Sequence, residues 1–206
     1  MNIKNYKNLK KNKANFDPLT PVDFLKRTAK IFPNYISIIS ENKKFTWGQT
    51  FNRCNLLATA LTKYKIKTGD VVSIMAPNTS AMYEAHFGIP MTGAILNAIN
   101  IRLDAKTISY IIGHSKTKII FVDTEFLPII REALKIKNLK IPIIAIKDDN
   151  KFSRNIKKEK LYEDFLKRGS KKNTTSFKIR DEWSPISLGY TSGTTNKPKG
   201  VVTHHR

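Results

Sequence analysis

The first regular pattern begins near Thr20, where hydrophobic residues recur at the spacing of one helical face: Val22, Leu25, Ala29 and Phe32. Thr20 is a good N-cap and Pro21 suits the first helical position, so together they predict where this helix starts. Pro33 is expected to end it. Residues 35–40 then have the pattern of a strand, and a turn leads from them into a short strand at residues 44–45.

A second helix is predicted from a capping box. The Thr46 side chain caps the helix, and the side chain of Gln49, three residues later, accepts a bond from the Thr46 backbone N–H. Its expected buried face is apolar: Phe51, Cys54, Leu57, Ala58 and Leu61. Because Cys54 lies on this face, we interpret it as a packed thiol rather than a nucleophile.

From Val71 onward, apolar runs alternate with helical patterns. Strands are expected at residues 71–76, 94–98, 118–122, 141–146 and 186–190, and helices at residues 79–92 (after a cap at Asn78 or Thr79), 104–114, 125–137 and 161–167. Strands that alternate with helices in this way predict an α/β fold, in which helices cover both faces of a parallel sheet. The chain shows no internal repeat.

Composition then limits the class of protein. The chain has 206 residues, of which 40% are hydrophobic and 10% aromatic, and this excludes a disordered chain. A single cysteine excludes an internal disulfide framework and a cysteine-based zinc site. No apolar run reaches the roughly 18 residues of a membrane-spanning helix, and the N-terminal region lacks the apolar segment of a secretory signal. We therefore expect a soluble, cytoplasmic protein.

The net charge of +21 raises the question of a nucleic-acid partner. Most of the basic residues are Lys, whereas Arg is the residue that suits bidentate recognition of phosphates and bases. Lys, Ile and Asn are abundant together, and all three can be encoded by codons of A and T alone. We attribute the charge to this compositional bias and expect no nucleic-acid partner, although a positive field could attract anionic substrates.

The N-terminal residues differ from the remainder of the chain. No acidic residue precedes Asp17, and the segment is rich in Lys and Asn. It lacks the Arg and Ser of a mitochondrial presequence. We expect a mobile basic tail over residues 1–19 and a folded unit over residues 20–206.

The stretch with the clearest chemistry is residues 190–200, Tyr-Thr-Ser-Gly-Thr-Thr-Asn-Lys-Pro-Lys-Gly, between two strand patterns. It combines hydroxyl side chains, a flexible glycine and lysines, which could offer backbone N–H groups, hydroxyls and a cation to a polyphosphate. The spacing is not that of a Walker A loop. On the residues alone, an ordinary polar hairpin turn remains an open alternative.

This string resembles the phosphate-binding signature of the adenylate-forming enzymes, Tyr-Thr-Ser-Gly-Thr-Thr-Gly-x-Pro-Lys-Gly-Val. It departs from that signature at Asn196, where the family usually has Gly, and Asn tolerates left-handed backbone angles better than most residues. Residues 44–61, 69–78 and 93–103 resemble further stretches of the same family in the same order. The resemblance therefore covers about residues 20–206, and residues 81–88 and 204–206 are similar to short- and medium-chain acyl-CoA synthetases.

The resemblance implies the N-terminal part of a large adenylation domain, incomplete and ending just after the phosphate loop. It implies an acid–thiol ligase that uses ATP and Mg²⁺ to convert a carboxylic acid to an acyl-adenylate and then transfers the acyl group to coenzyme A. The β- and γ-phosphates would be held by Thr191, Ser192, Gly193, Thr194, Thr195 and Lys199. His205 would support the acyl pocket, and Lys197 falls at a variable position of the signature.

Other titratable residues are expected to be structural. His86 and His114 lie on predicted helices and are interpreted as packed or exposed, without metal-ligand spacing, so no direct protein ligand for a metal is expected. The acidic pairs Asp148–Asp149 and Asp181–Glu182 are interpreted as solvated. The main catalytic lysine of the family is expected beyond Arg206, so the 206 residues alone are expected to be inactive and to leave an exposed sheet edge.

Two alternatives remain. The chain could be part of another adenylating enzyme, such as a peptide-synthetase adenylation domain or a luciferase-like enzyme. It could also be a non-enzymatic basic protein that binds phosphate or nucleic acid through a polar hairpin. Downstream pocket residues would separate the first of these from an acyl-CoA synthetase, and a steep salt dependence of RNA or DNA binding would favour the second.

Overall fold

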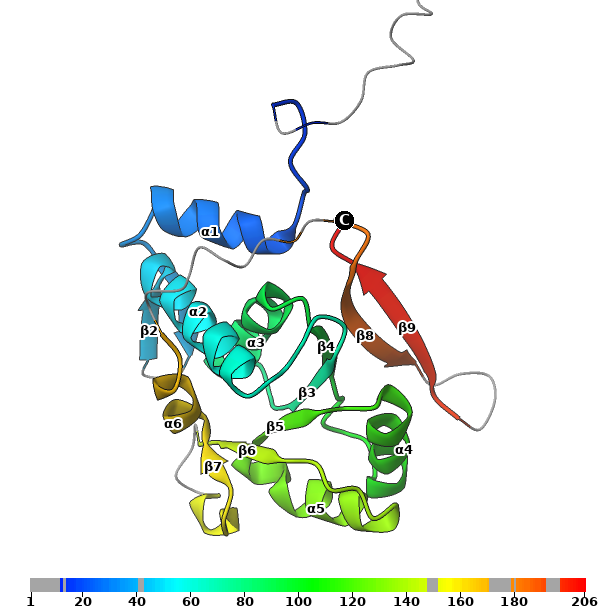
Figure 1. Ribbon diagram of the computed structural model, residues 1–206. Coiled ribbons are helices and arrows are strands. Elements are labelled where there is room, and N and C mark those ends of the chain that lie inside the picture. Colours follow the sequence, from blue (N-terminus) through cyan, green and yellow to red (C-terminus); the bar gives the residue numbers. More distant parts are fainter. Residues whose placement is uncertain are drawn as a thin grey trace, which may run out of the picture.

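The computed structural model describes residues 12, 14–40, 43–147, 152–170, 179, 181–191 and 197–206. Within these residues, a mostly parallel seven-stranded sheet has helices on both faces, and a two-stranded sheet lies apart from it (Figure 1). The predicted α/β class is confirmed.

The elements follow the predicted order with small changes at their ends. The helices are α1 (Pro21–Ile31), α2 (Trp47–Lys63), α3 (Ser80–Met91), α4 (Ala105–Ser115), α5 (Leu127–Ile136) and α6 (Tyr162–Lys167), with 3-10 turns η2 (Thr124–Phe126) and η3 (Ser153–Asn155). The strands are β1 (Ile36–Ser40), β2 (Lys43–Thr46), β3 (Val71–Met75), β4 (Ile95–Ala98), β5 (Ile119–Asp123), β6 (Ile143–Ile146), β7 (Lys160–Leu161), β8 (Pro185–Thr191) and β9 (Lys199–His204). The sequence analysis did not predict the two-residue strand β7.

The strand order in the large sheet is β7-β6-β5-β3-β4-β8-β9. All neighbours are parallel except β8 and β9, which form an antiparallel pair. Strand β9 is the last in the order, and its Val201 and Val202 are 47% and 58% exposed. An exposed apolar edge at this end of the sheet agrees with the sequence-based expectation.

The predicted caps determine where the helices begin. The Thr20 hydroxyl accepts a bond from the Asp23 N–H, and both bonds of the box between Thr46 and Gln49 are present. Of the two candidates for the cap of α3, it is Thr79 that accepts a bond from a backbone N–H. Each cap satisfies an N–H group that has no partner inside its own helix.

The prediction that Phe32 lies on the buried face of α1 is wrong. Phe32 is 47% exposed, whereas the other apolar residues predicted on that face of α1 are buried. Phe32 is the C-cap, with a non-helical backbone of φ −123° and ψ 50°, so its side chain leaves the helical face. It packs edge-on against Tyr35, which is itself exposed.

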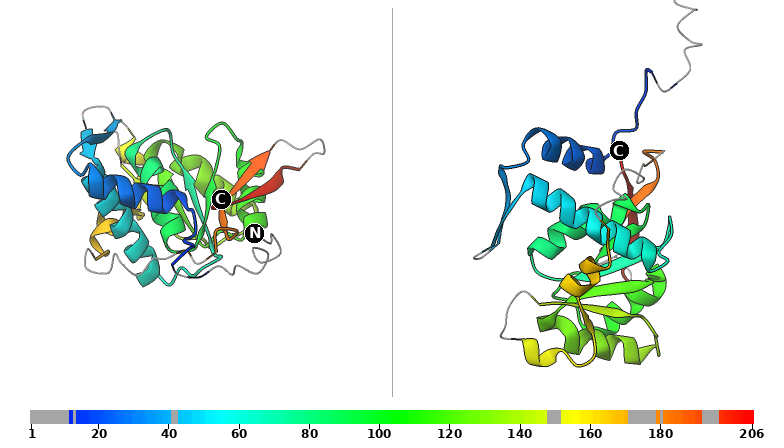
Figure 2. Two further views of the ribbon diagram at one scale, coloured as in Figure 1. Left: turned by 90° about the horizontal axis from the view of Figure 1, so that it is seen from above. Right: turned by 60° about the vertical axis from the view of Figure 1, so that its left-hand side comes forward.

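The sheet separates two apolar cores. One lies between the sheet and helices α2, α3 and α6, and the other between the sheet and helices α4 and α5 (Figure 2). Helices α2 and α3 approach closely at Gly88, where a Cβ atom would lie 2.8 Å from a methyl of Leu57. Cys54 is fully buried at the same contact and its Sγ lies 3.7 Å from the Glu84 carbonyl oxygen. This burial confirms the interpretation of Cys54 as a packed thiol, and it also raises the pKa of the thiol.

A buried carboxylate joins three helices on this face. Glu84 of α3 has no exposed surface, and it accepts bonds from Arg53 Nε at 2.5 Å and from the Tyr162 hydroxyl at 2.7 Å. Arg53 of α2 also makes two bonds to the exposed carboxylate of Glu163 on α6. Burial raises the pKa of Glu84, and the contacts with Arg53 oppose that shift. Since charges out of water need partners, this group depends on all three helices being in place.

We predict that Glu84→Ala lowers the free energy of unfolding by about 3–5 kcal/mol, because the buried Tyr162 hydroxyl and the half-buried Nε of Arg53 both lose their acceptor. Urea unfolding of the protein measures this. Glu163→Ala is the matched control: its carboxylate is 62% exposed, and its loss is expected to cost less than about 1 kcal/mol. Equal losses in the two variants would contradict the assignment.

Candidate functional site

The signature found in the sequence lies at the tip of the β8–β9 hairpin. The register places Thr191 directly opposite Lys199, and Tyr190 opposite Gly200. Opposite residues of an antiparallel pair share a face of the sheet, so the structure brings these two predicted phosphate-binding residues together. Both are exposed. The other predicted members of the loop, Ser192, Gly193, Thr194 and Thr195, lie outside the described residues, as does Asn196.

The hairpin occupies a position where open α/β sheets commonly bind ligands. Strand β8 runs parallel to β4, so Thr191, its last residue, lies at the carboxyl end of a strand in the parallel part of the sheet. Ligands of such folds bind outside the carboxyl ends of the strands. The hairpin projects beyond the sheet beside α4 (Figures 1 and 2).

A ring cluster holds the hairpin against α4. The Tyr190 hydroxyl lies 2.7 Å from His114 Nδ1, and the two rings meet edge to face at 5.8 Å. On its other side, His114 stacks on Tyr110 at 5.4 Å between ring centroids, and Lys137 Nζ lies over the Tyr110 ring. His114 is exposed, which fits its interpretation as a packed or exposed helix residue, but its bond to the residue directly before Thr191 was not predicted.

His205 is buried at the other end of the hairpin. It is 4% exposed, and neither ring nitrogen has a hydrogen-bond partner among the described residues. Its backbone N–H donates to the Ser184 carbonyl at 3.2 Å, which fixes the position of the residue. Burial lowers the pKa of the ring, and the nearby Asp23 carboxylate opposes this shift. The adjacent His204 packs on Trp183 with ring centroids 4.5 Å apart.

The interpretation of Glu182 as a solvated residue is wrong. Glu182 is 4% exposed and accepts bonds from the Leu19 N–H at 2.8 Å and from Arg206 Nη1 at 2.5 Å. Its neighbour Asp181, which stays exposed, accepts a bond from the Trp183 N–H and forms the turn between them. Glu182 therefore ties the segment before α1 to the end of β9, close to His205. Asp148 and Asp149 lie outside the described residues.

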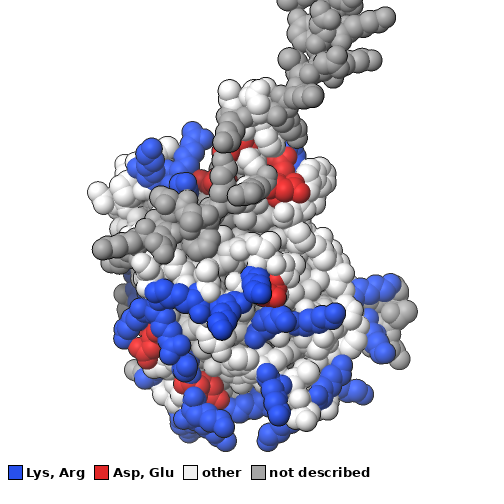
Figure 3. Space-filling view, in the orientation of Figure 1, with Lys and Arg blue, Asp and Glu red and all other residues white. Residues whose placement is uncertain are grey.

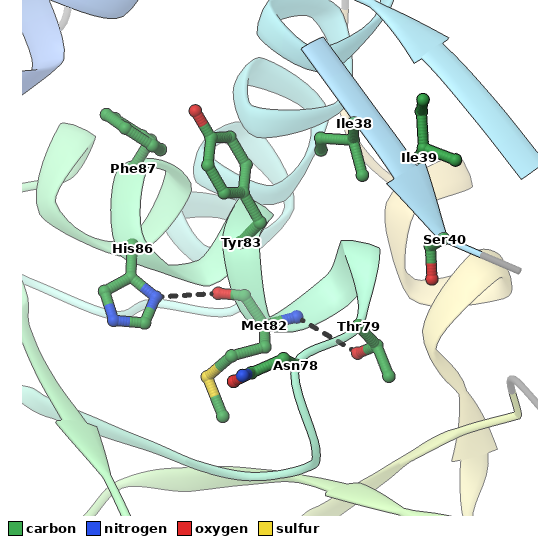
Figure 4. A pocket seen from close by; sticks show the side chains of 9 residues that line it. All are labelled: Ile38, Ile39, Ser40, Asn78, Thr79, Met82, Tyr83, His86 and Phe87. Atoms are coloured by element: carbon green, nitrogen blue, oxygen red, sulfur yellow. Dashed lines mark hydrogen bonds between the residues drawn. The ribbon is translucent and has the colours of Figure 1, made fainter.

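A cleft of about 440 Å³ lies between β1 and α3 (Figure 4). Its lining is mainly apolar: Ile38, Ile39, Ser40, Asn78, Thr79, Met82, Tyr83, His86 and Phe87. None of the predicted site residues lines it. His86 is exposed, which fits its interpretation as a packed or exposed helix residue, and its Nδ1 lies 2.8 Å from the Met82 carbonyl oxygen of the same helix.

Neither the charge on the face shown in Figure 3 nor the metal-binding side chains among the described residues mark a further site. On the face shown in Figure 3, Lys and Arg side chains are spread over several regions with acidic side chains among them. Within the described ranges, no group of three or more His, Cys, Asp or Glu side chains could hold a metal ion. The helices of the same ranges include none that is long and apolar enough to cross a bilayer.

Comparison with known proteins extends the resemblance found in the signature. The profile described as "AMP-binding enzyme" matches residues 25–206. A peroxisomal butyrate–CoA ligase of Arabidopsis thaliana is 48% identical, and the match covers 94% of this chain and 35% of the relative. A peroxisomal benzoate–CoA ligase of the same plant is 48% identical, and an acetate–CoA ligase of Humulus lupulus is 42% identical. The chain thus spans little more than a third of the length of these relatives.

Solved structures show the same fold. A crystal structure of an anthranilate–CoA ligase with anthranoyl-AMP superposes with a TM-score of 0.81 at 24% identity, covering 95% of this chain and 36% of that one. A luciferase-like enzyme from the mealworm Zophobas morio gives a TM-score of 0.78 at 23% identity, covering 96% and 45%. At these identities the likeness concerns the fold alone.

We predict that His205 makes stability depend on pH. The unfolded ring takes up a proton near pH 6.5, whereas the buried ring resists it, so the unfolded state binds more protons as the pH falls. The stabilisation is present above pH 6.5 and is lost progressively as the pH falls below 6.5.

Denaturant unfolding at several pH values checks this prediction. His205→Gln should lose the dependence over that range, and the matched control His86→Gln should keep the slope of the wild type. Identical slopes in wild type and His205→Gln would contradict it.

Proposed function

The chain belongs to the AMP-binding enzyme family, and from this premise we propose that it is part of an ATP-dependent acyl-CoA ligase. The intact ligase activates a carboxylic acid as its acyl-adenylate and transfers the acyl group to coenzyme A. The observation that carries the proposal is 42–48% identity, over nearly the whole chain, to relatives named as CoA ligases. Because the chain spans about a third of those relatives, the activity is proposed for the whole protein that contains it.

The chemistry explains what the hairpin must do. A carboxylate oxygen bonds to the α-phosphorus of ATP and pyrophosphate leaves with its electron pair. The thiolate of coenzyme A then bonds to the acyl carbon and AMP leaves. Mg²⁺ would supply charge neutralisation on the phosphates, which carry most of the oxygen ligands that it prefers. The protein's task is to position a polyanion and stabilise its charge.

We assign that task to the β8–β9 hairpin. Thr191 and Lys199 lie opposite each other at its tip, so a hydroxyl and an ammonium group can face the same phosphates. By the resemblance, Ser192, Gly193, Thr194 and Thr195 complete the site for the β- and γ-phosphates. Lys197, which is also exposed, falls at the variable position of the signature and is given no role.

We assign His205 a supporting role in the acyl pocket. Its ring is buried, and its two nitrogens have no partner among the described residues, so they can bond to a substrate or to a neighbouring part of the intact protein. The catalytic lysine of adenylation is expected beyond Arg206.

The relatives also bear on substrate and location. Three relatives at 43–48% identity are named for butyrate, for benzoate and for acetate or butyrate, which supports a short-chain or aromatic carboxylic acid as substrate. Several are named peroxisomal, and the cytoplasmic location expected from the sequence stays a prediction. The luciferase-like alternative shares the fold only, whereas the named CoA ligases share more than 40% of the sequence.

We predict that Lys199→Ala in the intact protein slows carboxylate-dependent ATP–pyrophosphate exchange by about 100-fold, because a charge that stabilises the reacting phosphates is lost. Lys197→Ala, two residues away and equally charged, should stay within about twofold of the wild type.

Equal effects of the two substitutions would contradict the role assigned to Lys199. RNA binding with a steep salt dependence that Lys199→Ala leaves unchanged, in a protein without exchange activity, would instead favour the basic binding protein.

A further inference from the structure

The β8–β9 hairpin has little backbone support at its tip. Strand β8 is paired to β4 only through Leu96 and Ser187, near the start of the strand. Beyond Ser187, the described residues of β8 pair with β9 alone, and β9 is the last strand of the sheet. A two-stranded ribbon that is free along one edge is only marginally stable by itself. The position of Thr191 and Lys199 therefore depends on side chains that tie the ribbon down.

Tyr190 provides such a tie. It packs against the core formed with α4 and α5, whereas its neighbour Gly189 has no side chain and the valines of β9 face outward. Its hydroxyl reaches His114 Nδ1 at 2.7 Å. Tyr190 directly precedes Thr191, so the contact lies within one residue of the predicted phosphate site. Burial raises the pKa of the Tyr190 hydroxyl, which keeps the proton on the oxygen.

His114 is itself well anchored. It lies in the last turn of α4, and the inner face of this helix is buried against the sheet. The next residue, Ser115, bonds to Thr117 at 2.7 Å, and Thr117 bonds to Ser73 of β3 at 2.6 Å. These buried hydroxyl bonds fix the end of α4 to the centre of the sheet. The chain of contacts from Ser73 to Tyr190 therefore runs from the rigid core to the hairpin tip.

We propose that His114 is a positioning residue for the phosphate-binding hairpin, acting through the Tyr190 hydroxyl. The inference rests on the proposed function, because it concerns how the same site is held. Misplacement of reacting groups by about 1 Å can cost orders of magnitude in rate, so a side-chain anchor at the base of the loop is a functional requirement. The consequence is selective: binding of ATP should suffer, and binding of the carboxylic acid should not.

The test uses the intact protein with His114→Ala, Tyr190→Phe and the double variant. We measure ATP affinity in the presence of Mg²⁺ by equilibrium dialysis, and KM values by carboxylate-dependent ATP–pyrophosphate exchange. Loss of one hydrogen bond at a single contact is expected to raise Kd and KM for ATP by about 3- to 10-fold in each single variant. The double variant should show no more than the larger single effect, and KM for the carboxylate should not change.

Two further variants separate positioning from general stability. His114→Gln keeps a side chain that can bond to the tyrosine hydroxyl and should recover part of the ATP affinity. His86→Ala removes the other exposed helix histidine, whose bond is to its own helix, and should leave ATP affinity unchanged. If His114 has a purely structural role, His114→Ala should instead lower the melting temperature and the active fraction, and the KM for ATP should be unchanged.

The outcomes distinguish this proposal from the proposed function. The positioning role is overturned if the wild type catalyses exchange and Tyr190→Phe binds ATP with unchanged affinity, or if the effects in the double variant are additive. Either result leaves the ligase proposal standing. Wild-type binding of ATP without exchange for any carboxylate overturns the ligase, and the dialysis values alone then decide on His114. A wild-type protein that binds no ATP overturns both.

Discussion

The parallel pairing of β4 with β8 is the contact on which the proposed site depends. It joins Leu96 to Ser187, residues far apart in the sequence, and so adds the hairpin to a sheet built from earlier parts of the chain. Such a non-local pairing must overcome the entropy of closing a long loop. Because it holds β8 at one described position, the remainder of the strand needs side-chain contacts to define its direction. The ring cluster at α4 and the carboxylate of Glu182 meet this need at the two ends of the hairpin.

Most of the fold could be predicted from local patterns. The capping residues Thr20 and Thr46 and the continuous apolar run of β3 are signals that act within a few residues, and the structure confirms each of them. The errors arise where a boundary changes the direction of a side chain, as at Phe32, or where an element is too short to have a period, as at β7. The separate β1–β2 sheet shows a further limit, because strand patterns do not specify which sheet a strand joins.

The candidate site also contains residues that could be predicted from the sequence and residues that could not. Thr191 and Lys199 were found because the signature is contiguous in sequence, and the hairpin register then places them together. Glu182 and Glu84 were not found, because a carboxylate becomes a buried anchor only through partners supplied by distant segments. A polar residue in a polar stretch has no periodicity that marks it as buried. Sequence reasoning is therefore better at locating groups that touch a ligand than at locating groups that hold them.

His114 illustrates why the second kind of group matters. By helical position it is an ordinary surface residue, and the exposed side of α4 gives no reason to single it out. Its significance comes from geometry: Ser115 and Thr117 bind one end of α4 to the sheet, and Tyr190, the first residue of the signature, meets that end. A loop that must bind a polyanion needs exposed donors, so it cannot also bury enough apolar surface to fix itself. The rigidity of such a loop has to come from the elements beside it, and α4 is the nearest one that is anchored in the core.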